Sequence, residues 1–593
     1  MGHSAIAAGA GAGRDRLSDL DDGAIGHILS FLDAKEAARA AALSSRWRHV
    51  FASVHTVSLE QPSLKQPERP QYDDNGPDRW HAHYIARPFV ATVASAILAR
   101  NRRLAAAVPL RALRVRMEGL VRYDKVGQWV SYALRRAGPE LDLDLRLARD
   151  PVCWGIDLDP RDYPSYRHDS SLPPDEDAAV GQMRPGSVLT AAGSQDRDHV
   201  HAPGEQPPGG VDDDDDAASS DDEVPPPQPP WYPVPNLPRR LLSCAALRSL
   251  RVAYCILPTP EVVSLPSLES LHITRARNKE EHVQRLISGC PLLADLTLEA
   301  CCWVTALCLL GNTRLRRLAL RLCDNLANVA IDASELLSFE YLGAIPDKSL
   351  LTISGGGGSG GGFPAITSCK IDTYVVRREE VHPGIGLPYV RWHKIDTYVA
   401  EDLVKLDSFL QLFVATKHLH LCSTRMGSYF VNLPEFSSLT HLELNGCVLR
   451  DDDPALAMAV TSSILGQAPN LELLTLVFQA PPQDPRNCGP DRSQGELLDM
   501  HLLNYDEYAA IDYTLTVSTP VPSCLMNRVS KIELVHYQGG RAQRTLAKFL
   551  LGNALALKKL YCGFAEGPEW IQMELMREIE GWVINDEASK EFR

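Results

Sequence analysis

The chain has 593 residues, of which 45% are hydrophobic and 23% are charged, and its formal net charge is -15 at pH 7. This length predicts several domains, and the composition is typical of soluble globular proteins. Ten acidic residues lie from Asp198 to Glu223 in a stretch without lysine or arginine, so this stretch carries -10 of the -15 and the rest of the chain about -5. This balance indicates no general affinity for nucleic acid or for an anionic membrane.

No targeting or membrane-spanning segment is evident in the sequence. The stretch from Ala5 to Gly13 consists mostly of small residues and lacks the bulky apolar centre of a signal peptide, and no apolar run approaches the length of a transmembrane helix. We therefore expect a nuclear or cytoplasmic protein.

The 14 cysteines form no CxxC pair, which argues against a zinc knuckle or a redox motif. Cys301 and Cys302 are adjacent, but no histidine stands beside them at the spacing of a metal ligand. We expect buried apolar roles for these side chains, and we expect neither a bound metal nor a cofactor.

The first patterned stretch, residues 15–54, predicts three short helices. The first helix, from Asp22 to Leu32, has one apolar stripe at helical spacing, which comprises Ile25, Ile28, Leu29 and Leu32. Asp33 and Glu36 form a capping box for a second helix that ends at Leu43. Ser44 can cap a third helix with Trp47 and Phe51. A module of this size usually needs support from a partner or a larger domain.

The motif from Asp15 to Phe51 resembles the F-box of plant F-box proteins with leucine-rich repeats and a C-terminal FBD segment. In that family the F-box docks on a Skp-type adaptor within a cullin-based ubiquitin ligase, and the remaining chain holds the substrate. The resemblance implies that six residues face or support the adaptor surface: Leu20, Ile28, Leu29, Leu32, Leu43 and Trp47. Asp21 stands where the family usually has proline, and Phe51 where it usually has tryptophan. Asp21 can cap the first helix instead. An ordinary helical hairpin without a partner is the alternative.

Residues 55–163 have the pattern of the first repeat units. Apolar periodicity predicts a helix between Pro88 and Asn101, a strand from Leu110 to Met117, a helix from Val126 to Arg136 and a strand from Leu141 to Leu147. Asp142 and Asp144 share one face of the last strand. With no acid/base motif around them, we expect ordinary exposed strand charges.

Regular patterning stops at residues 164–238, which are rich in proline, aspartate, serine and glycine. This composition cannot bury enough apolar surface to fold, so we expect a disordered insertion. Residues 1–14 are expected to form a disordered tail.

Residues 239–518 contain a repeat with the pattern LxxLxLxxC. Its strand leucines Leu250, Leu271, Leu296 and Leu318 are spaced by 21, 25 and 22 residues. This period is that of leucine-rich repeats, in which each unit adds one parallel strand. The hexapeptide KIDTYV occurs at Lys370 and again at Lys394. The two copies are either equivalent strands or a local duplication.

The side chains between the buried leucines should point to the concave face of the repeats, which is the usual binding surface of such folds. We expect a protein substrate to bind there, and the predicted contact residues are Arg251, His272, Thr297, Glu299, Arg321, Glu443, Asn445 and Thr475.

Residues 519–593 resemble the FBD segment of the same plant family. The matching features are Cys524-Leu525, a strand near Ile532, a glycine turn, a helix ending near Asn553 and a final strand from Leu557 to Tyr561. We expect this segment to cap the end of the repeats.

The resemblance and the repeats together predict an α/β chain, in which a three-helix F-box precedes a leucine-rich-repeat solenoid that the disordered insertion interrupts. No phosphate-loop, hydrolase or kinase motif occurs, so we expect no catalytic residue. The expected function is substrate recognition in an SCF-type cullin ubiquitin ligase. The alternative is an interaction scaffold that binds the adaptor without promoting ubiquitin transfer.

Overall fold

The computed structural model describes residues 19–42, 47–61, 81–101, 108–117, 123–146, 236–276, 278–301, 303–323, 325–332, 334–354, 362–379, 389–394, 400–422, 433–446, 453–478 and 519–593. Leu43, the predicted tail at 1–14 and all but the last three residues of the predicted insertion at 164–238 lie outside these ranges.

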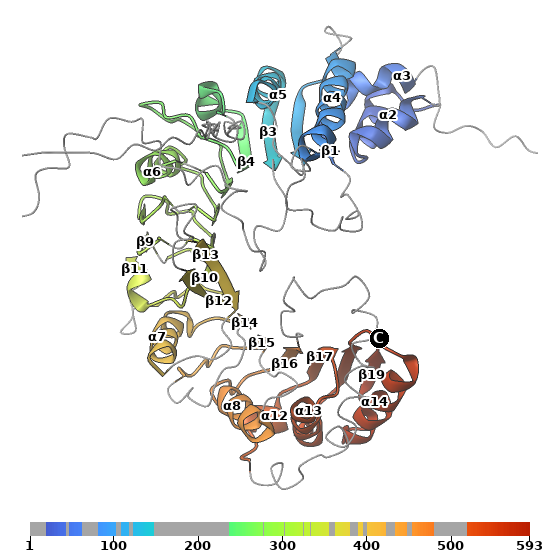
Figure 1. The fold of residues 1–593 in the computed structure, drawn as a ribbon, viewed down its shortest axis with the longest axis vertical. Coiled ribbons are helices and arrows are strands. Elements are labelled where there is room, and N and C mark those ends of the chain that lie inside the picture. The colour runs from blue at the N-terminus through green and yellow to red at the C-terminus, as the bar shows by residue number, and fades with distance from the viewer. Residues whose placement is uncertain are drawn as a thin grey trace, which may run out of the picture. The chain divides into compact units, whose positions relative to one another are not determined.

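One long sheet of parallel strands runs through the described part of the chain (Figure 1). It has 16 strands, and all but β13 follow one another in chain order. They are β1 (Thr56–Glu60), β2 (Leu110–Arg116), β3 (Ala137–Arg146), β4 (Leu247–Ala253), β5 (Ser270–Thr274), β6 (Asp295–Glu299), β8 (Arg317–Arg321), β10 (Ser338–Gly343), β12 (Ser368–Glu379), β13 (Tyr389–Lys394), β14 (His418–Cys422), β15 (His441–Asn445), β16 (Leu473–Val477), β17 (Lys531–Tyr537), β18 (Lys559–Phe564) and β19 (Ser589–Phe592).

The register of this sheet follows the sequence repeat. Leu250 pairs with Leu271, Leu271 with Leu296, and Leu296 with Leu318, so the same repeat position is aligned from β4 to β8. These leucines are at most 1% exposed, and burying each contributes about 1.5–3 kcal/mol. The predicted α/β fold with stacked parallel strands is confirmed.

Helices and a second, smaller sheet complete the repeats. The sheet contains β7 (Ala306–Leu309), β9 (Asn328–Asp332) and β11 (Leu351–Ser354), all parallel. The helices of the repeats and of the C-terminal segment are α5 (Tyr123–Arg136), α6 (Glu280–Ser288), α7 (Ala400–Leu410), α8 (Pro454–Gly466), α12 (Ser523–Asn527), α13 (Arg541–Asn553) and α14 (Glu569–Trp582). None of the described helices combines the length and apolarity needed to cross a membrane.

A residue in the left-handed region ends several strands. Tyr254, Arg275, Ala300 and Leu322 have φ between 50° and 53°, and Gly446 has φ of 71°. Each of the first four is a non-glycine residue, for which this conformation is unfavourable. The backbone N–H of Ala300 still donates to the carbonyl of Arg321 at 2.7 Å, so the turn keeps the backbone paired with the next repeat.

Two sequence expectations are wrong in detail. Helix α4 spans His81–Asn101 and contains Pro88, instead of beginning after it. The strand predicted at Leu557–Tyr561 is not the last, because α14 and β19 follow β18. Of the second KIDTYV copy only Lys394 lies within the described residues; it ends β13, which pairs antiparallel with β12, while the parallel neighbour of β12 is β14.

A buried arginine joins the N-terminal module to the first repeat. Arg100, on α4, is 0% exposed. Its guanidinium donates to the carbonyl of Val54 at 2.7 Å, to the hydroxyl of Tyr132 at 2.9 Å and to the carbonyl of Val108. Val54 follows the N-terminal helices, Tyr132 lies on α5 and Val108 precedes β2. One side chain thus supplies the donors for three separate segments.

Replacing this arginine should loosen the junction. We expect Arg100→Met to lower the free energy of local opening by about 2–5 kcal/mol, since each buried acceptor left without a donor costs about 1–3 kcal/mol. Native-state hydrogen exchange of the amides in β1 and β2 measures this effect. The matched control is Arg136→Met, because Arg136 is only half-buried and donates to the Asn101 side chain at 2.7 Å. Equal protection in the two variants would contradict the assignment.

A buried carboxyl group makes stability depend on pH. Asp407 of α7 is 5% exposed, and its Oδ1 has no hydrogen-bond partner among the described residues. Burial raises the pKa of Asp407 to about 6 from an ordinary value of 3.8. Because the folded pKa is the higher one, the contribution of this group to stability is complete below about pH 4 and is lost as the pH rises through about 6.

We therefore expect Asp407→Asn to raise the melting temperature near neutral pH and to have little effect near pH 4. Asp347 supplies a control of opposite sign, because hydrogen bonds from Ser349 lower the pKa of its carboxyl group. Asp347→Asn should lower the melting temperature at neutral pH, and this loss should shrink in acid. Melting curves recorded at pH values below and above the isoelectric point of about 5.7 test both expected changes in melting temperature. A pH-independent difference for Asp407→Asn would refute its role.

Candidate functional site

The N-terminal module consists of α1 (Asp22–Leu29), α2 (Ala34–Ala42) and α3 (Trp47–Val50). The Asp21 side chain accepts a hydrogen bond from the backbone N–H of Ala24 at 2.7 Å and so caps α1. Asp33 likewise accepts from the N–H of Glu36 at 2.7 Å. The caps predicted at Asp21 and Asp33 are thus confirmed, and the third predicted cap, Ser44, lies outside the described residues.

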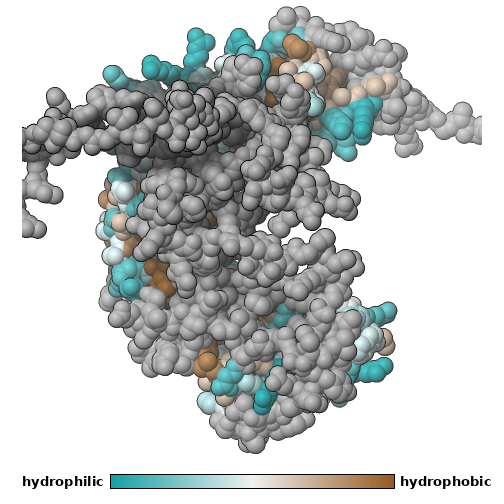
Figure 2. Space-filling model, viewed as in Figure 1, coloured by the Kyte–Doolittle hydropathy of each residue, from teal (hydrophilic) through white to brown (hydrophobic). Residues whose placement is uncertain are grey.

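Two apolar side chains of this module face the solvent. Ile28 is 44% exposed and Phe31, two residues after α1 ends, is 78% exposed. The rings of Phe31 and His27 meet edge to face with centroids 5.0 Å apart, which holds Phe31 against the helix. Figure 2 shows hydrophobic and hydrophilic side chains side by side over the N-terminal helices. We call Ile28 and Phe31 the exposed apolar pair.

The other predicted adaptor residues lie deeper. Leu29 is 1% exposed and belongs to the core. Leu20, Leu32 and Trp47 are partly buried and pack against that core. Of the predicted adaptor residues that the structure describes, Ile28 therefore has the most accessible side chain, while Leu29 is buried in the core. The sequence prediction of adaptor contacts did not include Phe31. Its position outside the apolar stripe of the helix could have indicated that this large apolar side chain is exposed.

All eight predicted substrate residues lie on one face of the main sheet, opposite the buried leucines, and we call it the polar face. In the strand register they occupy two adjacent rows. The first row holds Arg251, His272, Thr297, Glu443 and Thr475, and the second holds Glu299, Arg321 and Asn445. Thr475 is only 9% exposed, so it offers little surface to a partner.

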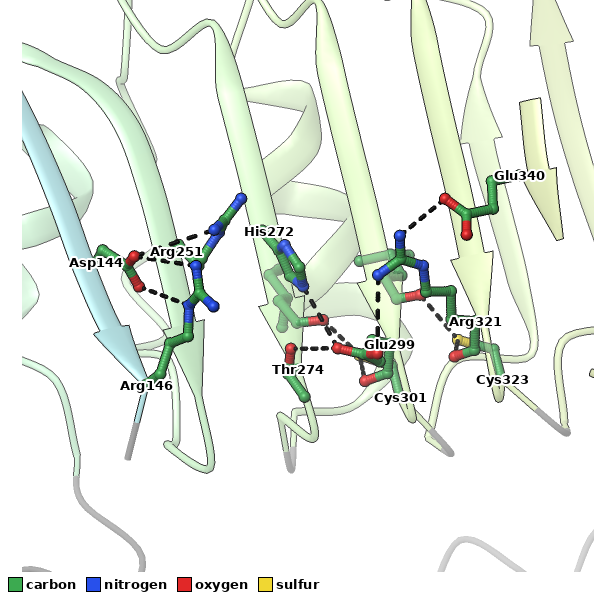
Figure 3. Close-up of polar contacts among 12 residues, drawn as sticks. Asp144, Arg146, Arg251, His272, Thr274, Glu299, Cys301, Arg321, Cys323 and Glu340 are labelled. Atoms are coloured by element: carbon green, nitrogen blue, oxygen red, sulfur yellow. Dashed lines mark hydrogen bonds and ion pairs between the residues drawn. The ribbon is translucent and has the colours of Figure 1, made fainter. Parts of the chain in front are cut away.

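Neighbouring strands of the polar face are joined by ion pairs and hydrogen bonds (Figure 3). Glu299 accepts from Thr274 at 3.0 Å and lies 3.5 Å from His272. Arg321 reaches Glu340 at 2.8 Å and Glu299 at 3.9 Å. The charged groups Glu299, Arg321 and Glu340, on β6, β8 and β10, thus alternate in sign from one strand to the next.

These contacts shift the pKa values of Glu299 and Arg321. Burial alone would raise the pKa of the Glu299 carboxyl group, but hydrogen bonds from His272 and Thr274 outweigh it, so the pKa is lowered. Burial would lower the pKa of Arg321, yet the hydrogen bond to Glu340 raises it overall. Both groups therefore stay ionised at neutral pH and act as fixed charges, not as proton donors or acceptors.

The polar face continues through the later strands. His420 lies 3.0 Å from Glu443, and its hydrogen bond lowers the pKa of the Glu443 carboxyl group. Thr475 donates to Glu533 at 3.0 Å, which links β16 to β17. Residues that the sequence analysis did not name, such as Glu340 and His420, share the first register row. Their repeats match the leucine motif only in part, which is why they were missed.

The described residues contain no group of three or more metal-ligating side chains at binding distance. Of the repeat-motif cysteines that the structure describes, Cys255 and Cys301 are buried and Cys323 is partly buried. Burial raises the pKa of the Cys255 thiol to about 12, so this thiol stays protonated and unreactive. The Cys301 thiol donates to the carbonyl of Ile273 in the preceding repeat at 3.6 Å.

Comparison with protein families matches three parts of this architecture. Residues 17–57 match the F-box domain, residues 518–561 match the FBD segment, and residues 223–348 match the repeats described as those of the FBD-associated F-box protein At5g56370. The chain carries an F-box, leucine-rich repeats and an FBD segment. The F-box match contains α1 to α3 with the exposed apolar pair, and the repeat match contains the polar face from β4 to β10.

Similar proteins occur in Arabidopsis thaliana. The F-box/LRR-repeat protein At4g14103 is 22% identical over 482 residues, which span 79% of this chain and 92% of that protein. The F-box/LRR-repeat protein At5g38396 is 32% identical over 23% of this chain and 27% of its own length. The FBD-associated F-box protein At5g38590 is 25% identical over 54% of this chain and 62% of its own length. The similarity thus extends through the repeats.

Proposed function

We propose that this protein is the substrate-recognition subunit of an SCF-type cullin ubiquitin ligase. The observation that carries the proposal is the exposed apolar pair, Ile28 and Phe31, on a domain that matches the F-box. An F-box implies docking on a Skp-type adaptor. Large apolar side chains exposed together on a small module are characteristic of a surface that a partner covers.

We further propose that the polar face binds the protein substrate. Its charges of both signs suit the mixed surface of a protein better than the uniform charge of a nucleic acid or an anionic membrane. In this proposal the F-box contributes no catalytic group. Ubiquitin transfer is carried out by the other subunits of the ligase, in the nucleus or the cytoplasm.

The exposed apolar pair gives the first test. We expect Ile28→Asp and Phe31→Asp each to weaken co-purification of a Skp-type adaptor at least about tenfold, because an apolar contact worth roughly 1.5–3 kcal/mol is replaced by a buried charge. The control is Val262→Asp, which changes a side chain that is 76% exposed in a distant loop. Leu29→Asp is unsuitable, because Leu29 lies in the core and the variant should unfold the module.

Unchanged adaptor binding in both Ile28→Asp and Phe31→Asp would refute the docking surface. Detection of cullin in the same purification distinguishes a ligase subunit from a scaffold that binds the adaptor alone. A ligase subunit brings cullin and ubiquitinated proteins with the adaptor, whereas a scaffold brings the adaptor without ubiquitin transfer.

The polar face gives the second test. We expect simultaneous replacement of Arg251, Glu299, Arg321 and Glu443 by alanine to change the set of proteins found by proximity labelling, while adaptor binding persists. These side chains form ion pairs and hydrogen bonds between strands, and that of Glu299 is only 16% exposed, so a melting curve of the variant must show that its repeats stay folded. If the set is unchanged, but replacement of the exposed Trp570 and Met573 of α14 removes it, the substrate binds the C-terminal segment and the polar-face proposal is wrong.

A further inference from the structure

Helix α14 presents two large apolar side chains to the solvent. Trp570 is 53% exposed and Met573 is 41% exposed. Because they are three residues apart, they are neighbours on the helix surface. Ile571, Leu575 and Ile579 form the buried side of the same helix and belong to the core. Trp570 and Met573 therefore lie outside the buried stripe, and we call them the α14 pair.

The position of α14 leaves its outer side accessible. The helix lies in the row that flanks β16 to β19 (Figure 1). It packs against α13, and it is the last helix of the part of the chain that the structure describes. In a repeat protein each unit is normally covered by the next one. Among the described residues no further repeat covers α14, so a partner can reach the α14 pair.

Carboxylates stand on both sides of the α14 pair. With about 3.6 residues per turn, Glu569 and Glu580 lie along one flank of the pair and Glu574 lies along the other. All three are exposed, and none of them forms an ion pair with another described residue. Glu578 differs, because it is half-buried and pairs with Arg544 of α13. The three flanking carboxylates are therefore available to a partner.

The charge around α14 is negative overall. Arg577 is the only basic residue of the helix, so it offsets one of the three flanking carboxylates and leaves two. Residues 566–593 contain eight acidic and three basic residues, which gives a net charge of -5. Together with the -10 of residues 198–223 this accounts for the whole formal charge of -15. The rest of the chain is therefore neutral overall.

We propose that α14 docks a basic amphipathic segment of a partner protein. Apolar side chains of that segment contact the α14 pair, and its lysine or arginine side chains face the flanking carboxylates. Exposed aromatic and methionine side chains within a charged rim are typical of the centre of a protein interface. The flexible thioether of Met573 can adapt to the partner's side chains. This inference goes beyond the proposed function, because neither the F-box nor the polar face contributes to this surface.

The charge of this surface argues against other occupants. A second copy of the chain would bring two net-negative helices together around a twofold axis, and like charges facing each other are unfavourable. The same carboxylates repel the phosphates of a nucleic acid and the head groups of an anionic membrane. A basic protein segment supplies both the apolar contact and the opposite charge.

The test measures binding of fluorescent peptide pools to the full chain by anisotropy. The first pool has leucines at helical spacing with lysine and arginine elsewhere, the second keeps the leucines but has glutamate elsewhere, and the third keeps the basic residues but has serine for leucine. We expect the first pool to bind best and to bind more weakly as the salt concentration rises.

Substitutions then assign this binding to α14. We expect Trp570→Ala to weaken binding of the first pool about tenfold or more, as for truncation of an interface anchor. Glu574→Lys should weaken it about two- to tenfold and reduce its salt dependence. Trp303→Ala is the matched control, because Trp303 lies between β6 and β7 and is 55% exposed. It should leave binding unchanged. Melting curves verify that each variant is folded, and Glu574→Lys decides the outcome if Trp570→Ala is not.

Three results would overturn the inference: binding of the second pool as tight as that of the first, binding of the third pool as tight as that of the first, or equal losses for Trp303→Ala and Trp570→Ala. A dimer of the full chain that Trp570→Ala dissociates, without peptide binding, would assign the surface to a second copy. Binding of duplex DNA or anionic vesicles that Trp570→Ala abolishes would also reject the basic segment.

Discussion

The structure depends on the alignment of buried leucines across parallel strands. Since side chains alternate along a strand, a register that places Leu250, Leu271, Leu296 and Leu318 in one buried row places the residues between them on the opposite face. A shift by one residue would expose the leucines and bury the charges. The hydrophobic core therefore fixes which polar side chains become neighbours, and the polar face follows from the packing of the core.

The same alignment determines which charged side chains of the polar face become neighbours. Each charged residue stands opposite a residue at the same position in the next repeat, about 5 Å away, so pairs such as Glu299 and Arg321 form directly across strands. Arg321 also reaches Glu340 diagonally, from one register row to the other. These pairs link neighbouring repeats and hold the charged side chains in fixed positions on the polar face.

The sequence predicts the repeating part of the fold well and the local exceptions poorly. The leucine spacing predicts the strands from β4 to β8 because burial of one face dominates their energetics. It could not predict that β13 (Tyr389–Lys394) returns antiparallel against β12, since these residues lack the leucine pattern of the repeats. Pro88 was expected before a helix, but α4 begins at His81 and passes through it. The left-handed residues that precede repeat cysteines, Tyr254, Ala300 and Leu322, also escaped notice, because none of them is glycine.

For the candidate sites, the apolar periodicity of the sequence predicted on which face of a helix or strand each residue lies. It did not predict how exposed each side chain is. Ile28 and Leu29 share one helical stripe, yet Ile28 is 44% and Leu29 1% exposed, because α1 ends at Leu29 and the following turn leaves only part of the stripe covered. Phe31 lies off that stripe and was not named. Arg116, Arg146 and Arg251 approach Asp144 from three adjacent strands. Arg116 and Arg251 are more than a hundred residues apart in the sequence, so only the folded structure brings them together.

We propose that the exposed apolar pair of the F-box, and not the polar face, contacts the adaptor. Hydrogen–deuterium exchange of the full chain, alone and with a Skp-type adaptor, tests this proposal without any substitution. We expect slower exchange in residues 19–42 on adaptor binding and unchanged exchange in β4 to β8. Slower exchange in β4 to β8 or in α13 and α14, with none in residues 19–42, would contradict it.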